Sequence, residues 1–513
     1  MIARRCFRGG VLLAVCLLAV CPVGAVERTG GLIGAGTRWA TPYYVIDSKT
    51  AGPTVMITGG MHGNEPAGAR AAEHIRFWTI RRGKLIIVPR LNVKALAAGW
   101  RLIPGAPEGE GNLNRNFPRT GLPDKAIGAP AAAIWAFVKS TKPDWLLDLH
   151  EGFAFHKSNP KSSGASIISL PELKLGDTVE MMLDAVNASV SDDGEKLVAL
   201  RGSANGSLAR AAAQRLGAKA MMLETCYTGQ YMSLRTRQHR VMVHRLLKHL
   251  KMVDCASDRM APPGRSVVRV AIYNGPSAGD SPGLNLEKIL CSRPGMLVRL
   301  VGPPDIAGGV LAGQFDAVIF GGGSGKGQAS NIGDSGHKAI RAFVKGGGGY
   351  LGICGGAYLA TSEYEWGLKI IDARTVDRKH WKRGKGKVKM ELTKQGSAIL
   401  GAPGPTVDII YANGPLLGPY NRDDLDDYEV LARFRGEINE NKAPKGVMLN
   451  SPAVIFGRFG AGKVILFSPH PEKTEALHPF VHRAVAHIAR RRTKAEFPQK
   501  THHFIRGAHY SIE

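Results

Sequence analysis

Two side chains that can bind a metal ion lie three residues apart in the segment GGMHGNEPAG, residues 59–68. They are His62 and Glu65, and an apolar stretch typical of a β-strand precedes them. His150 closes a second apolar stretch, DWLLDLH, and Glu224 closes a third, AKAMMLE. A catalytic zinc ion commonly uses two histidines and one glutamate as ligands and leaves one position open for water. We therefore predict one Zn²⁺ ion bound by His62, Glu65 and His150.

The fourth residue of this group, Glu224, is predicted to be a general base. A bound zinc ion lowers the pKa of its water to about 7 and polarises a scissile carbonyl group. A separate carboxylate can then take the proton of that water and pass it to the leaving nitrogen. Together these groups have the chemistry needed for amide hydrolysis.

Alternating strand and helix patterns would position these residues in an α/β domain. Apolar runs of strand length alternate with helical patterns, which predicts a sheet with helices on both faces. Because ligands bind at the carboxyl ends of strands in such sheets, residues that end different strands are expected to meet there. The predicted strands cover residues 54–60, 84–92, 144–152, 165–171 and 218–225, and the predicted helices cover residues 68–78, 129–140 and 206–217.

A second set of chemically capable residues lies in a second predicted α/β domain. Cys354 stands between glycines at a strand-to-helix junction, the pattern of a nucleophile elbow. His470 and Glu472 follow a later strand, so a thiolate, a base and an orienting carboxylate could form a triad. The glycine-rich segment 320–327 could offer N–H groups to an oxyanion or an anionic ligand. The predicted strands cover residues 267–275, 296–302, 315–323, 348–356 and 463–472, and the predicted helix covers residues 336–347.

The chain length of 513 residues indicates at least two domains. Residues 254–266 are polar, contain a Pro-Pro-Gly turn signal and lack apolar periodicity, so we place a linker there. The first domain is then expected at residues 26–253 and the second at 267–490, followed by a basic C-terminal tail at 491–513.

The N-terminus has the features of a secretory signal. Three arginines precede an apolar run, and a VGA sequence resembling a cleavage site ends it, which predicts a signal peptide over residues 1–25. We expect an exported protein, periplasmic or extracellular, with no transmembrane segment after signal removal. The sequence LAVC, ending at Cys21, leaves a lipid anchor as a less favoured alternative.

The net charge of +26 favours an anionic neighbourhood. For an exported protein we expect an anionic cell-wall polymer and no nucleic acid as the partner. The densest basic run is RKHWKRGKGKVK, residues 378–389. Its favoured interpretation is a solvated loop or hairpin, with binding of an anionic polymer as the alternative.

The motifs of the first domain resemble those of the zinc carboxypeptidase superfamily. The resemblance is to its compact branch, which includes murein peptide amidases and the succinylglutamate desuccinylase/aspartoacylase deacylases, and it covers roughly residues 50–250. HGNE matches the family's His-x-x-Glu, DLHEG supplies the third ligand His150, and LETCYTG supplies the general base Glu224.

The same resemblance implies roles for three more residues. Asn114 and Arg115 in NRNF match the pair that holds the substrate carboxylate, for which a guanidinium has suitable geometry. Arg101 would stabilise the oxyanion, with Arg90 as the alternative. Beside His150, Asp148 is expected either to orient that ligand or to be a satisfied buried carboxylate.

The second domain resembles the class I glutamine amidotransferases, and more closely the amidotransferase-like domain at the N-terminus of some biotin–protein ligases. The resemblance covers roughly residues 267–490, implies a flavodoxin-like fold, and matches Cys354, His470 and Glu472 to the catalytic triad. No ammonia-using synthetase domain accompanies it. Glutaminase activity, another thiol chemistry and a ligand-binding or structural role therefore all stay open.

We predict an exported zinc metallohydrolase that cleaves an amide bond next to a free carboxylate. The favoured substrate is a small peptidoglycan-type peptide, cleaved as by a carboxypeptidase or amidase. The alternative within the same chemistry is an N-acyl amino acid deacylase of the succinylglutamate desuccinylase/aspartoacylase type. The alternative from another class is a cell-wall ligand-binding protein with an inactive amidotransferase-like domain.

Overall fold

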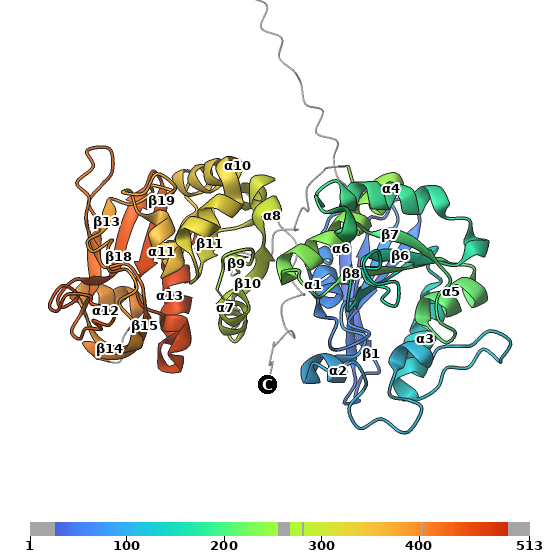
Figure 1. The fold of residues 1–513 in the computed structure, drawn as a ribbon. Helices are drawn as coiled ribbons and strands as arrows, with labels where there is room; N and C mark the ends of the chain where they lie inside the picture. The colour runs from blue at the N-terminus through green and yellow to red at the C-terminus, as the bar shows by residue number, and fades with distance from the viewer. Residues whose placement is uncertain (1–25, 255–266, 280–281, 402–403, 491–513) are drawn as a thin grey trace, which may run out of the picture.

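The computed structural model describes residues 26–254, 267–279, 282–401 and 404–490. The predicted signal peptide, nearly all of the predicted linker and the basic tail lie outside the described residues. Within the described ranges, no helix combines the length and the apolar character needed to cross a bilayer. The described residues form two lobes, each built around a mixed sheet with helices (Figure 1).

The first lobe contains an eight-stranded sheet in the order β1-β2-β4-β3-β5-β8-β6-β7. Its central strands β4, β3, β5 and β8 are parallel, whereas β1, β2 and β4 pair antiparallel at one side and β6 is antiparallel to β8 at the other. The strands are β1 (Glu27–Ile33), β2 (Thr41–Asp47), β3 (Thr54–Gly59), β4 (Lys84–Val88), β5 (Trp145–Gly152), β6 (Ser166–Ser169), β7 (Val198–Arg201) and β8 (Lys219–Cys226).

Helices cover both faces of this sheet because its central strands are apolar on both sides. Val55 and Ile57 of β3 pack in one apolar cluster with α1, α4 and α6, whereas Met56 packs in the opposite cluster with α3 and α5. The helices are α1 (Pro66–Ile75), α2 (Val93–Ala98), α3 (Ala129–Thr141), α4 (Gly176–Asn187), α5 (Leu208–Leu216) and α6 (Met232–His249), with short 3-10 turns at Leu113–Arg115, Pro171–Leu173 and Asp193–Glu195.

The second lobe contains a nine-stranded sheet in the order β10-β9-β11-β12-β19-β18-β17-β14-β15. The first five strands in this order are parallel, and the remaining four extend the sheet with antiparallel pairing. The strands are β9 (Val268–Tyr273), β10 (Met296–Val301), β11 (Ala317–Phe320), β12 (Gly349–Ile353), β14 (Lys385–Leu392), β15 (Thr406–Ala412), β17 (Glu429–Phe434), β18 (Pro452–Phe459) and β19 (Gly462–Phe467), while β13 (Ala373–Thr375) and β16 (Leu417–Pro419) form a separate pair.

Helices again lie on both faces of the second sheet, which carries apolar clusters on each side. Ser324 caps α10 because its hydroxyl accepts a hydrogen bond from the Gly327 amide at 3.1 Å. The helices are α7 (Pro282–Cys291), α8 (Pro303–Ala307), α9 (Val310–Gln314), α10 (Gly325–Lys345), α11 (Gly355–Ala360), α12 (Lys394–Leu400) and α13 (His478–Ile488), with 3-10 turns at Pro471–Lys473 and Glu475–Leu477.

The structure confirms the predicted fold class of two α/β domains. All ten predicted strands and four predicted helices are present. Most of their ends are shifted by a few residues, but the helix predicted over residues 336–347 is α10, which begins eleven residues earlier, at Gly325. The 18-residue helix α6 and the strands β1, β2, β7, β14, β15, β17 and β18 were not predicted. β14 and β15 alternate between exposed or half-buried and buried residues, so they lack the continuous apolar run by which the central strands are identified.

A buried polar cluster joins the two lobes at α6 and α8. Arg240 on α6 donates to Asp305 Oδ1 on α8 at 3.1 Å and contacts His74 Nδ1 on α1 at 3.0 Å. Arg299 donates to the same Asp305 oxygen at 3.4 Å, and all four side chains are buried. Because the Asp305 carboxylate receives hydrogen bonds from a buried guanidinium group of each lobe, this cluster holds the two lobes in contact.

Replacing Asp305 with alanine is therefore expected to lower the free energy of unfolding by about 3 kcal/mol, because it leaves buried positive charge without its carboxylate. Denaturant-induced unfolding followed by circular dichroism measures this change. Asp334→Ala, on an exposed position of α10, is the matched control and should change stability by less than about 0.5 kcal/mol. Equal stability of the two variants would contradict the assigned role.

Candidate active site

Three adjacent parallel strands bring the predicted metal ligands together. In the sheet, β3 lies beside β5 and β5 lies beside β8. His62 and Glu65 occupy the turn from β3 to α1, whereas His150 lies near the carboxyl end of β5. Glycine is required at position 63 of this turn, since a Cβ there would lie 1.8 Å from the Ala95 carbonyl oxygen.

The ligand atoms of His62, Glu65 and His150 converge on one point. Nδ1 of His62 lies 2.8 Å from Glu65 Oε1, and Nδ1 of His150 lies 2.9 Å from Glu65 Oε2. The three ligand atoms lie within 4.8 Å of one another, and all three side chains are buried. This group is a possible metal site of the His-Glu-His type.

The outer nitrogen of each histidine is held by another side chain. Nε2 of His150 lies 2.9 Å from Asp148 Oδ2, and Nε2 of His62 lies 3.2 Å from Asn112 Oδ1. An oxygen acceptor at Nε2 favours the tautomer that carries its proton there, which leaves the Nδ1 lone pair directed at the Glu65 carboxylate. Two lone pairs and a carboxylate around one point suit a divalent cation, so the residues fit Zn²⁺.

Charge interactions couple the three groups to one another. Burial lowers the pKa of His62, with Glu65 opposing that shift. The pKa of His150 is raised well above its ordinary value, because Asp148 and Glu65 outweigh the effect of burial. The two histidines outweigh burial at Glu65 and lower the pKa of that carboxyl group. The site therefore stabilises positive charge between a carboxylate and imidazole nitrogens.

Asp148 contacts His150 and also accepts a hydrogen bond from the Thr58 hydroxyl at 2.7 Å. We expect Asp148→Asn to weaken zinc binding about 10- to 100-fold, because the charged partner that orients His150 is lost. Competition with a fluorescent chelator measures that affinity. Asp144→Asn is the matched control, since the Asp144 carboxylate accepts a hydrogen bond from the Thr54 backbone amide at the start of β3, the end opposite to the ligands. Equal zinc affinity of both variants would contradict the orienting role.

Glu224 lies beside the ligand set on the neighbouring strand. It pairs in register with His150 between β8 and β5, so both side chains project from the same face of the sheet. Glu224 is buried, and its Oε2 has no hydrogen-bond partner among the described residues. Burial, together with the charges of Glu65 and Asp148, raises the pKa of Glu224 to about 8. Such a carboxyl group can accept and release a proton near neutral pH.

The structure distinguishes the two arginines that the sequence left as alternatives. Arg101 forms an ion pair with Glu65 through Nη1, and its side chain is about half exposed. Arg90 forms an ion pair with Glu73 at 3.2 Å instead. Arg101 is thus the arginine beside the ligand set.

Asn114 and Arg115 also lie at this site, but Asn114 is already engaged. Nδ2 of Asn114 lies 3.4 Å from His150 Nε2, and its Oδ1 accepts a hydrogen bond from the Leu208 amide at 3.1 Å. Arg115 is half-buried and donates to the Asn114 carbonyl oxygen at 2.7 Å. Burial lowers the pKa of Arg115. Arg115 is therefore the member of the pair with an exposed face that could meet a substrate anion.

Two residues that follow His150 closely in the sequence, Glu151 and His156, form side-chain hydrogen bonds outside the ligand set. Glu151 accepts a hydrogen bond from the Ala67 amide at 2.7 Å and pairs with Arg235 at 2.7 Å, which anchors the start of α1. His156 bonds the Ser162 carbonyl oxygen at 2.7 Å. Sequence reasoning missed Asn112, although it belongs to the same polar run as the Asn-Arg pair.

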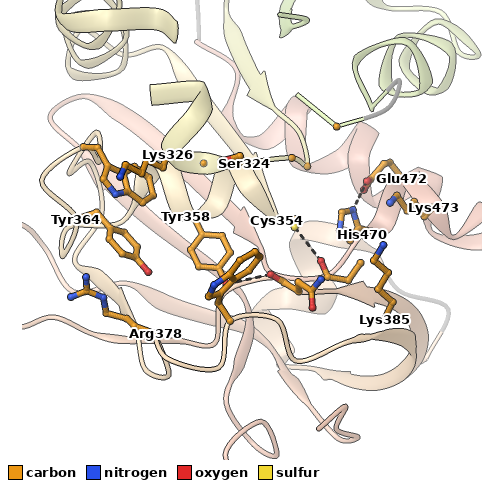
Figure 2. A pocket seen from close by; sticks show the side chains of 18 of the residues that line it. Ser324, Lys326, Cys354, Tyr358, Tyr364, Arg378, Lys385, His470, Glu472 and Lys473 are labelled. Atoms are coloured by element: carbon orange, nitrogen blue, oxygen red, sulfur yellow. Dashed lines mark hydrogen bonds and ion pairs between the residues drawn. The ribbon is translucent and has the colours of Figure 1, made fainter. Parts of the chain in front are cut away.

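The second predicted set of residues also gathers at one sheet edge. Cys354 follows β12, and His470 follows the adjacent strand β19. His470 Nδ1 lies 2.6 Å from Glu472 Oε1, while the Cys354 thiol donates to the Ala412 carbonyl oxygen at 3.4 Å. Figure 2 shows Cys354 and the His470–Glu472 pair facing one pocket.

The basic run at residues 378–389 is not simply a solvated loop. Arg378, Lys379, Trp381 and Lys385 line the pocket of Cys354. Arg383 is buried and donates to Asp377 Oδ2 at 2.6 Å. Part of the run therefore supplies positive charge to the second site.

Comparison with known families confirms both resemblances. Residues 51–250 match the family described as the succinylglutamate desuccinylase/aspartoacylase catalytic domain. Residues 311–382 match the family described as biotin-protein ligase, N terminal. The family of the first match is one of hydrolases of the deacylase and amidase kind.

One curated relative is N-alpha-acetyl-L-2,4-diaminobutyric acid deacetylase of Halomonas elongata. It is 39% identical over 105 residues, which are 20% of this chain and 29% of that relative. The chain thus matches under a third of that relative's length.

Two solved structures illustrate the distant structural similarity. Product-bound cell shape determinant protein Csd4 of Helicobacter pylori has 19% identity and a TM-score of 0.35, covering 45% of this chain and 56% of that one. A succinylglutamate desuccinylase from Silicibacter sp. TM1040 has 23% identity and a TM-score of 0.35, covering 46% of this chain and 70% of that one.

Proposed function

We propose that the first domain is a zinc-dependent hydrolase that removes the acyl group from an N-acylated amino acid bearing a free carboxylate. The observation that carries the proposal is the convergence of His62, Glu65 and His150, with Glu224 in register beside them. The match of residues 51–250 to a deacylase family supports this substrate class above a cell-wall peptide.

Each residue near the metal site has a definable task in this reaction. A bound zinc ion would supply a Lewis acid and activate a water molecule. Glu224 would accept the proton of the attacking water and deliver it to the leaving amine nitrogen. Arg101, beside Glu65, would face the negative charge that develops on the carbonyl oxygen. Arg115 would bind the substrate carboxylate through two N–H groups.

A cell-wall peptide is the second candidate, and two observations favour it. The chain carries a net charge of +26 and a predicted export signal, and both would suit a protein that acts at an anionic cell wall. Large aromatic side chains are also exposed after the strands β5 and β8 and after α2, and they could contact a substrate longer than one amino acid. They are Trp100, Phe153, Tyr227 and Tyr231.

The two candidates are separated by offering zinc-loaded protein matched substrates. One set contains N-acetyl amino acids and their C-terminal carboxamides, and the other contains muropeptides, with products identified by mass spectrometry. We expect release of acetate from the free acids and at least about tenfold lower kcat/KM for the carboxamides, because one charge-assisted contact is lost. Arg115→Gln should abolish this preference.

Two other results would change the assignment. Cleavage of muropeptides alone would favour the cell-wall peptide, and the mass lost would identify the bond. Absence of hydrolysis in both sets by protein that has bound zinc would contradict the proposed function.

A further inference from the structure

Cys354 occupies a strained turn at the carboxyl end of β12. Its φ is 51° and its ψ is −100°, a conformation that non-glycine residues rarely adopt. Flanking glycines make the turn possible, since a Cβ on Gly352 would lie 2.5 Å from the Gly356 carbonyl oxygen, and a Cβ on Gly356 would lie 1.9 Å from that of Phe320. The fold thus holds the thiol at the sheet edge at an energetic cost, as nucleophile elbows do.

His470 faces the same point with an unsatisfied nitrogen. Its Nδ1 is paired with Glu472, whereas its Nε2 is buried and has no hydrogen-bond partner among the described residues. An added Cβ on Gly322 would lie 3.0 Å from His470 Cε1 and 4.0 Å from Cys354 Cβ, so the two side chains flank one backbone position. Interactions with Cys354 and Glu472 outweigh burial and raise the pKa of His470 to about 10. Buried ring nitrogens normally have a hydrogen-bond partner, and here a ligand or the Cys354 thiol can be that partner.

The cavity in front of these residues has a volume of about 1350 Å³. This exceeds the roughly 300–1,000 Å³ typical of sites for small molecules and is far more than one amino acid needs. Among the described residues that line it, Glu472 is the only one with a carboxylate, and that group is paired with His470. The lining cations are Lys326, Arg378, Lys379, Lys385 and Lys473.

Aromatic rings give the cavity a second recognition surface. Tyr364 and Trp366 stack with ring centroids 4.4 Å apart, and the Arg378 guanidinium lies 4.9 Å from the Tyr364 ring centroid. Figure 2 shows Tyr364 and Arg378 across the pocket from Lys385 and Lys473, with Cys354 between them. A ligand that reaches the thiol therefore passes between positive charges and flat apolar surfaces.

We propose that the second domain is a cysteine-dependent hydrolase of an amide or ester in a carboxylate-rich acyl compound larger than a single amino acid. This activity is separate from the metal site and does not rest on it. The substrate class is inferred from the size and positive charge of the cavity. The nucleophilic reaction is inferred from the strained turn at Cys354 and the neighbouring His470–Glu472 pair.

The reaction balances with water as the only co-reactant. The Cys354 thiolate attacks the acyl carbon and forms a thioester, while protonated His470 gives its proton to the departing nitrogen or oxygen. Water then attacks the thioester, and His470 takes a proton from that water. The C–S bond breaks, which yields a carboxylic acid and restores the Cys354 thiolate beside protonated His470. Glu472 holds the imidazole ring through Nδ1 during both steps.

The test uses the full chain carrying Glu224→Gln, so that the metal site contributes little. The substrates are p-nitrophenyl esters of two acetylated tripeptides that differ only in carrying two glutamates or two glutamines, and free L-glutamine is a third substrate. We expect kcat/KM to be at least about tenfold higher for the acidic ester than for its neutral twin. Adding Cys354→Ala should lower turnover at least about 10³-fold, and intact mass spectrometry should detect the acyl-enzyme only when Cys354 is present.

Matched variants separate chemistry from folding and from general charge effects. Cys291→Ser should retain turnover, and the thermal midpoint of Cys354→Ala should stay near that of its parent. The double variant Arg378→Gln, Lys385→Gln should bring the ratio of kcat/KM for the acidic ester to kcat/KM for the neutral ester close to one. Lys338→Gln, at an exposed position of α10, should leave this ratio unchanged. Equal turnover without Cys354, equal or faster turnover of the neutral ester, glutamine as the best substrate, or no turnover of any substrate would each overturn the proposal.

Discussion

Replacing Glu224 with glutamine is expected to lower kcat for amide hydrolysis by about 10²- to 10⁴-fold while the protein keeps one bound zinc ion. Glutamine has nearly the same shape but cannot take a proton from the attacking water. Glu224 pairs in register with His150 and is not among the three converging ligands, so zinc binding should survive. Steady-state kinetics and metal analysis of the same preparation measure both properties.

Glu172→Gln, at an exposed position of the same domain, is the control for the loss of a carboxylate. It should change neither kcat nor zinc content. Full activity of Glu224→Gln would show that another group accepts the proton.

Replacing His62 with alanine is expected to remove zinc binding and hydrolysis together. His62 supplies one of three ligand atoms, and its loss leaves too few donors to retain the ion against dilution. We expect the zinc affinity to fall at least about 100-fold and hydrolysis to reach the background rate. Mass spectrometry of the protein-bound metal, before and after dialysis against a weak chelator, measures the first effect.

His249→Ala, at the exposed end of α6, controls for the loss of a histidine. The contrast between His62→Ala and Glu224→Gln is informative because both positions are buried in the same site. If His62→Ala kept one zinc ion per chain, the ligand assignment would be wrong.

The central parts of both sheets could be predicted because their strands are apolar on both faces. β3 and β5 read as continuous apolar runs, and their carboxyl ends bring the candidate ligands together. β14 could not be identified in this way. Its sequence KGKVKMEL alternates between exposed lysines and buried apolar residues, and its first five residues belong to the basic run, which resembles a loop in the sequence.

The site residues could be predicted where residues that act together lie close to one another in the sequence. The spacing of His62 and Glu65 is visible in the sequence, whereas the choice between Arg101 and Arg90 depends on how the loop after β4 folds. Only the structure shows that Arg90 pairs with Glu73. The basic run and Cys354 border one cavity although they lie apart in the sequence, and no periodic pattern encodes that proximity.

The metal site is tested most directly by X-ray diffraction at the zinc absorption edge, from crystals of the full chain grown with one equivalent of zinc. We expect a single anomalous peak between the Nδ1 atoms of His62 and His150 and the carboxylate of Glu65. The Glu224 carboxylate should lie nearby without being one of the protein ligands. A peak at any other group, or no peak between these three residues when zinc is bound in solution, would contradict this expectation.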